Sequence, residues 1–155
     1  MAIEETFDLG IQLEEKMSEC YKEISRLCQE ESLAREFIRL SNDEIVHRNL
    51  LVMGKNYLKV APDIFHLRRE RIGELETGLN KITKLIERIH DKHISLEEAL
   101  NDAAEIERLF EQFHLRTVAE VKDASLKNLF EALSVDDKAH RMRLIGVMKR
   151  FYGAS

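Results

Sequence analysis

The sequence is poor in the residues that interrupt helices and shape the turns of β-proteins. It has one Pro, six Gly and no Trp in 155 residues, so an all-β sandwich is excluded and a few long helices are expected. No apolar run approaches the roughly 20 residues that a membrane span needs, which argues against a membrane partner. A chain of this length supports one hydrophobic core, and we therefore expect a single domain over residues 1–155.

Cysteine is also scarce, and acidic residues outnumber basic ones. Cys20 and Cys28 match no disulfide or zinc spacing, so we expect both to be reduced and buried. The first residues lack the charged and apolar regions of a secretory signal, which predicts a cytoplasmic protein. The net charge of −5 argues against nucleic acid as a partner. The one basic cluster, Arg68, Arg69 and Arg71, is interleaved with acidic residues and is interpreted as a solvated helix face.

The chain is internally duplicated at an offset of 93 residues. Nine identities fall within twenty positions: Ser32, Leu33, Phe37, Leu40, Ser41, Asp43, His47, Arg48 and Leu51 recur as Ser125, Leu126, Phe130, Leu133, Ser134, Asp136, His140, Arg141 and Leu144. The two halves therefore have equivalent helices in the same order.

Apolar residues recur at alternating spacings of three and four, the pattern of a helix packed in a bundle. The first helix is expected from about residue 3 to 30, and its copy opens with Ser95 and Glu98, a capping-box pattern. Connections near residues 31 and 124 are short enough only for antiparallel neighbours. The sequence thus predicts an all-α, antiparallel four-helix bundle made of two αα-hairpins, residues 3–58 and 95–152.

A crossover joins the two hairpins and contains a further helical pattern. It begins after Pro62, and a helix is expected within about 65–92 because apolar residues from Ile72 to Ile89 keep the same spacing. Its apolar edge either packs on the bundle or forms the seam of a homodimer. Three histidines of the crossover are expected at the surface: His66, His90 and His93.

Six polar residues interrupt the apolar seams at matching depths in the two halves. They are Glu14, Glu44, His47, Glu107, Asp137 and His140. The two acid-x-x-His pairs project an oxygen and a nitrogen from one helix face, and a lone Glu from each partner helix completes two equivalent sites. Burying four carboxylates is costly, and two divalent cations would neutralise them. Alternatively, protonation, water or mutual hydrogen bonds satisfy the polar seam.

The ligand types bear on the identity of the metal. Oxygen-rich coordination with one imidazole per metal favours iron or manganese over structural zinc, which prefers Cys and His sets. We expect two iron ions, with manganese as the alternative.

Around these residues the sequence resembles the ferritin-like di-iron carboxylate superfamily, in particular its rubrerythrin-like branch. The similarity lies in Glu14 followed by Tyr21 and in the segment from Glu44 to His47. It implies that the six seam residues are metal ligands and that Tyr21 orients one of them by a hydrogen bond. Three positions depart from the family pattern: Asp137 replaces Glu, His114 replaces Tyr, and Phe110 stands where rubrerythrins have an additional Glu.

The departure at His114 leaves three interpretations open: a hydrogen-bond donor to a ligand, an additional ligand, or a neutral core histidine. By the resemblance, Tyr21 and His114 are the catalytic candidates, which would fix ligands or deliver protons.

The resemblance implies a function in oxidative stress: an oxidoreductase that reduces hydrogen peroxide or dioxygen at a buried di-iron centre. The two Cys-x-x-Cys motifs of a rubredoxin domain are absent from the sequence. An external electron donor, such as a rubredoxin-like protein, is therefore expected. Two alternatives are a ferroxidase or iron-handling protein, and a non-enzymatic, metal-stabilised helical protein that binds a partner.

Overall fold

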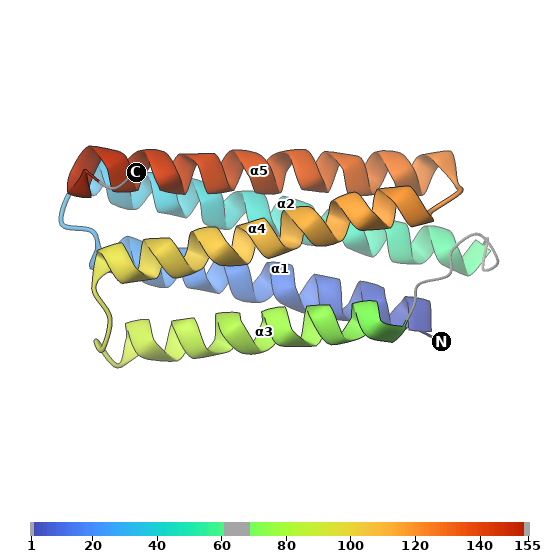
Figure 1. Ribbon diagram of the computed structural model, residues 1–155, viewed down its shortest axis with the longest axis horizontal. Coiled ribbons are helices and arrows are strands. Elements are labelled where there is room, and N and C mark those ends of the chain that lie inside the picture. Colours follow the sequence, from blue (N-terminus) through green and yellow to red (C-terminus); the bar gives the residue numbers. More distant parts are fainter. Residues whose placement is uncertain (1, 61–68, 154–155) are drawn as a thin grey trace.

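The computed structural model describes residues 2–60 and 69–153, which form five α-helices. They are α1 (Ala2–Leu27), α2 (Glu31–Val60), α3 (Arg69–His90), α4 (Leu96–Glu120) and α5 (Ala124–Tyr152). The helices lie side by side along one direction, with α3 at one edge (Figure 1). No strand occurs within the described ranges, which confirms the all-α prediction. None of the helices in these ranges is both long and apolar enough to cross a membrane.

The helix boundaries follow the duplication. Adding 93 to the last residue of α1, Leu27, gives the last residue of α4, Glu120, and adding it to Glu31 gives Ala124, where α5 begins. Within each half the helices pack closely, α1 on α2 and α4 on α5, whereas the backbones of α2 and α5, and those of α1 and α4, come close at fewer positions. The two hairpins are therefore the main packing units of the fold.

Local capping signals set the ends of the second hairpin. The Glu98 N–H donates to Ser95 Oγ at 3.1 Å, and the Ser95 N–H donates to Glu98 Oε2 at 3.1 Å, so the predicted capping box at the start of α4 is confirmed. Asp123 caps α5 by accepting the Leu126 N–H at 3.0 Å. The helix ends at Gly153, whose φ of 65° is favourable for glycine.

The crossover helix α3 packs mainly on α1 and also contacts α4. Its apolar edge is buried there through Ile72, Ile82 and Ile89, so it packs within the chain, one of the two predicted arrangements. A homodimer stays a prediction. His90 and His93 are exposed as expected, whereas Pro62 and His66 lie outside the described residues.

Arg71 corrects the prediction of a solvated basic face. Its side chain is buried, with 5% of the residue exposed. The guanidinium donates to Glu120 Oε1 at 2.8 Å, to the Phe113 carbonyl at 2.6 Å and to Thr117 Oγ1 at 3.0 Å, and it lies over the Phe113 ring. Burial of this charge is tolerated because α4 supplies a carboxylate and two neutral acceptors. The side chains of Arg68 and Arg69 lie outside the described residues.

The two cysteines are both free. Cys20 is buried as expected, whereas Cys28 is half-buried, so the prediction of burial is wrong for the second. Burial raises the pKa of the Cys28 thiol to about 11, so the group is a thiol at neutral pH.

Gly54 lies where α2 comes closest to its neighbours. A Cβ at this position would lie 2.7 Å from Leu129 Cδ2 and 2.7 Å from Phe7 Cε1, both well inside van der Waals contact. Gly146, in the matching helix α5, would meet nothing within 4 Å. The absence of a side chain is therefore required by packing at Gly54 and not at Gly146.

We expect Gly54→Ala to have a lower free energy of unfolding than Gly146→Ala by about 1–3 kcal/mol. Both variants gain the same helix propensity, so the difference isolates the cost of overpacking against the Phe7 ring. Urea denaturation of the two metal-free variants measures it. Equal stability of the two variants would contradict the close packing at Gly54.

Candidate metal centre

The polar seam residues meet in the interior of the molecule. All six are at most 5% exposed, and they come from four helices: Glu14 from α1, Glu44 and His47 from α2, Glu107 from α4, and Asp137 and His140 from α5. Each acid-x-x-His pair lies on one face of its helix because residues three apart are neighbours on a helix surface. The sequence therefore placed all six correctly in the interior.

One group that could hold a metal ion consists of Glu14, Glu44 and His47. His47 Nδ1 lies 3.2 Å from Glu44 Oε2 and 3.6 Å from Glu14 Oε2. One ligand atom from each residue lies within 4.8 Å of the other two. Two oxygens and one imidazole nitrogen thus face a common point.

A second such group consists of Glu44, Glu107 and His140. His140 Nδ1 lies 2.7 Å from Glu44 Oε1 and 3.3 Å from Glu107 Oε1. Glu44 belongs to both groups, with Oε2 directed at His47 and Oε1 at His140. The two imidazole rings are stacked with 5.4 Å between their centroids, so the two groups are adjacent. A carboxylate in this position is placed to bridge two cations.

Asp137 is buried beside these groups but belongs to neither. Its Oδ2 is 2.6 Å from Nδ1 of His114, with which it forms a hydrogen bond. The sequence predicts Asp137 as the equivalent of Glu44, but its side chain is one methylene shorter and engages a different partner. Its role as a metal ligand stays a prediction.

Tyr21 and His114 occupy equivalent positions in the duplication but contact different elements. The Tyr21 hydroxyl donates to Glu107 Oε1 at 2.5 Å, a bond between α1 and α4. His114 instead pairs with Asp137 on α5, the other helix of its own hairpin. Tyr21 therefore has the contact expected of a residue that orients a ligand, whereas the hydrogen bond of His114 goes to Asp137, the acid outside the two groups.

The sequence-based prediction missed Asp43 and Asp136, which lie at the outer ends of the two imidazoles. His47 Nε2 is 3.1 Å from Asp136 Oδ2, and His140 Nε2 is 3.2 Å from Asp43 Oδ2. With the Nε2 proton directed at the aspartate, the Nδ1 lone pair faces the buried carboxylates, the arrangement typical of metal-binding histidines. The signal was present, because Asp43 and Asp136 are identical in the duplication and directly precede the acid-x-x-His pairs.

All four buried carboxylates keep one oxygen without a hydrogen bond. These atoms are Glu14 Oε2, Glu44 Oε1, Glu107 Oε2 and Asp137 Oδ1. Glu44 Oε1 is close to His140 Nδ1, but the pair lacks hydrogen-bond geometry. A buried acceptor without a partner costs roughly 1–3 kcal/mol, which a cation would remove. The unpaired oxygens and the one imidazole per group therefore suit a divalent cation.

Protons offset the buried charge when no cation does. Burial lowers the pKa values of His47 and His140, but hydrogen bonds and charge from Glu14, Glu44 and Glu107 outweigh it and raise them to about 12 and about 11. Burial and the neighbouring carboxylates raise the pKa values of Glu44 and Asp137 well above the usual range. This corresponds to the alternative in which protonation compensates the buried polar residues of the seams. Protons and cations then compete for the same ligand atoms.

Two further groups have shifted pKa values. Burial lowers the pKa of His114 to about 4, so its imidazole is neutral at pH 7. Burial, and then the charge of Glu107, raise the pKa of Tyr21 well above 10, so its phenol stays protonated and donates to Glu107. Tyr21 therefore holds a proton next to a buried carboxylate, whereas His114 is a neutral hydrogen-bond partner of Asp137.

No protein-family model, curated protein or solved structure matches the chain. The interpretation of the centre consequently depends on its own geometry.

Metal binding at pH 7 is expected to release at least two protons, one from each of His47 and His140, because a cation needs the Nδ1 lone pairs. Both imidazoles are protonated below their raised pKa values, so the affinity for Fe(II) or Mn(II) should increase as the pH rises. Titration calorimetry in two buffers of different ionisation enthalpy counts the protons. Binding without proton release would contradict this charge arrangement.

Asp43→Asn and Asp136→Asn are each expected to lower metal affinity about 10- to 100-fold, because the imidazoles lose the carboxylates that orient them. Asp102→Asn is the matched control, since Asp102 is half-exposed, as Asp43 and Asp136 are, and pairs with Arg88 instead of a histidine of the centre. Competition with a fluorescent chelator measures the affinities. Equal affinities in all three variants would show that Asp43 and Asp136 do not support the histidines.

Proposed function

We propose that the chain is a ferritin-like di-iron protein of rubrerythrin type that reduces hydrogen peroxide or dioxygen. In this proposal α1, α2, α4 and α5 form a ferritin-like four-helix bundle, and α3 is an additional helix. The observation that carries the proposal is Glu44, whose two oxygens face two adjacent buried groups, each with its own Glu and His. A mononuclear or purely structural metal site would not need a shared, central carboxylate.

Each residue has a distinct task in this centre. Glu14 and His47 would hold one ion, Glu107 and His140 the other, and Glu44 both. Bound there as ferrous ions, the metals would supply one electron each, which with two protons reduce hydrogen peroxide to two molecules of water. Tyr21 would position Glu107 and keep a proton next to the reacting atoms, because its hydroxyl donates to that carboxylate.

The protein surroundings support such chemistry in two further ways. The six seam residues are almost completely shielded from water, which strengthens electrostatic interactions and limits side reactions. Residues 1–155 contain two cysteines, fewer than the four of a rubredoxin site, so the electrons would come from an external donor. Both cysteines are free, which suits the reducing cytoplasm that we propose as the location.

Wild-type protein loaded anaerobically is expected to bind two iron ions per chain and to consume peroxide or dioxygen with a donor present. Glu44→Gln should lose both ions, because it removes the shared charge at similar volume, whereas His47→Ala and His140→Ala should each retain about one. Elemental analysis and oxidant consumption on the same preparations measure this. His90→Ala is the control because His90 is exposed, and its iron content and oxidant consumption should equal those of wild type.

Unchanged iron content in all three site variants would reject the centre. Iron binding without consumption of either oxidant would reject the enzyme while leaving a metal-stabilised protein. Oxidation of many more than two ferrous ions per chain by dioxygen would instead support the iron-handling alternative.

A further inference from the structure

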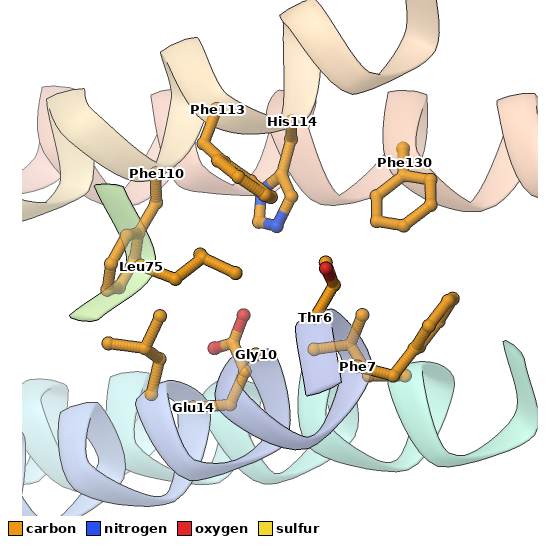
Figure 2. A pocket seen from close by; sticks show the side chains of 11 residues that line it. Thr6, Phe7, Gly10, Glu14, Leu75, Phe110, Phe113, His114 and Phe130 are labelled. Carbon is orange, nitrogen blue, oxygen red and sulfur yellow. The ribbon is translucent and has the colours of Figure 1, made fainter. Parts of the chain in front are cut away.

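A small cavity adjoins the Glu14 side of the centre. Its volume is about 20 Å³, and its wall is formed mainly by apolar side chains of all five helices. They include Phe7, Leu51, Leu75, Phe110 and Phe130. Figure 2 shows Glu14 of α1 and His114 of α4 pointing toward this space from opposite sides. The cavity is thus in contact with one of the residues of the first metal group.

The cavity arises where the two halves of the duplication differ. Position 114 corresponds to Tyr21, which is completely buried and reaches Glu107 with its hydroxyl. His114 is shorter and is directed at Asp137, so no equivalent side chain covers Glu14. At Gly10 the wall has no side chain, and a Cβ there would approach Leu51 Cδ1 to 3.2 Å. The space beside Glu14 therefore lies at a position where the two halves of the duplication differ.

The size and polarity of the cavity select among small oxidants. A volume of about 10–15 Å³ is the minimum for one water molecule, so the cavity has room for a single small molecule. In a space whose wall is mainly apolar, hydrogen peroxide could keep hydrogen bonds only to polar groups such as Glu14 and His114, and it would lose the others on entering. Dioxygen has no hydrogen bonds to lose, so the apolar wall favours it.

A separate, polar opening lies between α2 and α5. This hollow of about 220 Å³ is lined by Asp43, His47, Asp136, His140 and Arg143. It leads to the outer ends of the two imidazoles, where both aspartates are half-exposed. Polar species such as ferrous ions and hydrogen peroxide can therefore reach the outer ends of the two imidazoles without passing through the apolar cavity.

We propose that the apolar cavity beside Glu14 is a binding site for dioxygen, held next to the first metal group. This inference names dioxygen as the oxidant that meets the Glu14 side of the centre. Its redox part rests on the proposed function. Two ferrous ions bound in the centre would supply one electron each, which with two protons from solvent would convert dioxygen to hydrogen peroxide. The binding of an apolar molecule in the cavity does not itself require a metal.

Xenon tests the cavity directly, because it occupies dry apolar cavities and is inert. Crystals of the metal-free protein under xenon pressure should show the atom between Glu14, Leu75 and Phe130 in wild type. Leu75→Phe fills the cavity from α3 and should therefore abolish xenon binding. Leu79 lies one turn further along the same helix, outside the cavity wall, so Leu79→Phe should retain xenon binding. Gly10→Ala is a second filling variant and should reduce xenon occupancy if Leu75→Phe does not fold.

Stopped-flow oxidation of the ferrous-loaded protein tests the choice of oxidant. Leu75→Phe should slow oxidation by dioxygen about tenfold or more and leave the peroxide rate close to that of Leu79→Phe. An ordered water in place of xenon, or equal slowing with both oxidants, would overturn the proposal. Failure to bind iron would reject the proposed function instead, and the xenon result would still decide whether the cavity binds an apolar molecule.

Discussion

The burial of four carboxylates in a helical interior is the constraint on which the rest of the structure depends. Water does not reach these groups, so each negative charge must be offset by a proton, a hydrogen bond or a cation. Some of the compensating groups lie within one hairpin, such as His47 beside Glu14 and Glu44, and others come from across the hairpin boundary: Tyr21 donates to Glu107, and His140 contacts Glu44. These polar contacts add to the apolar core that the two hairpins share, in which Phe7 of α1 packs near Phe130 of α5.

The features that repeat along the chain could be predicted from the sequence. The spacing of three and four fixed which side of each helix is buried, and the duplication showed that Glu14 and Glu107, or His47 and His140, lie at equal depth. Periodicity defines a face and a depth, but it does not define a partner. The bond of Asp137 to His114 instead of to a metal group, and the shared position of Glu44, depend on side-chain conformations that the pattern does not encode.

Charged residues outside the seams also show that a sequence pattern does not define partners. One is buried although the pattern predicts a surface residue, and two are half-exposed although they contact the site. Arg71 belongs to a basic cluster of ordinary appearance, yet it is buried because Glu120 and the Phe113 carbonyl, more than forty residues away, accept its hydrogen bonds. Asp43 and Asp136 lie on half-exposed positions, yet each contacts a buried imidazole of the opposite hairpin. In both cases the partner lies on another helix, and only tertiary packing brings the two together.

The loss of symmetry between the halves bears most directly on chemistry. An exact duplication would give each Glu its own tyrosine and each acid-x-x-His pair the same role. Replacement of Tyr by His at position 114 gives Glu107 a phenol and gives Glu14 an apolar space, so the two metal groups have different surroundings. A molecule that enters the cavity meets only the Glu14 side. Two cations held by similar ligands would then perform unequal tasks, one facing the oxidant and the other supported by a fixed proton donor.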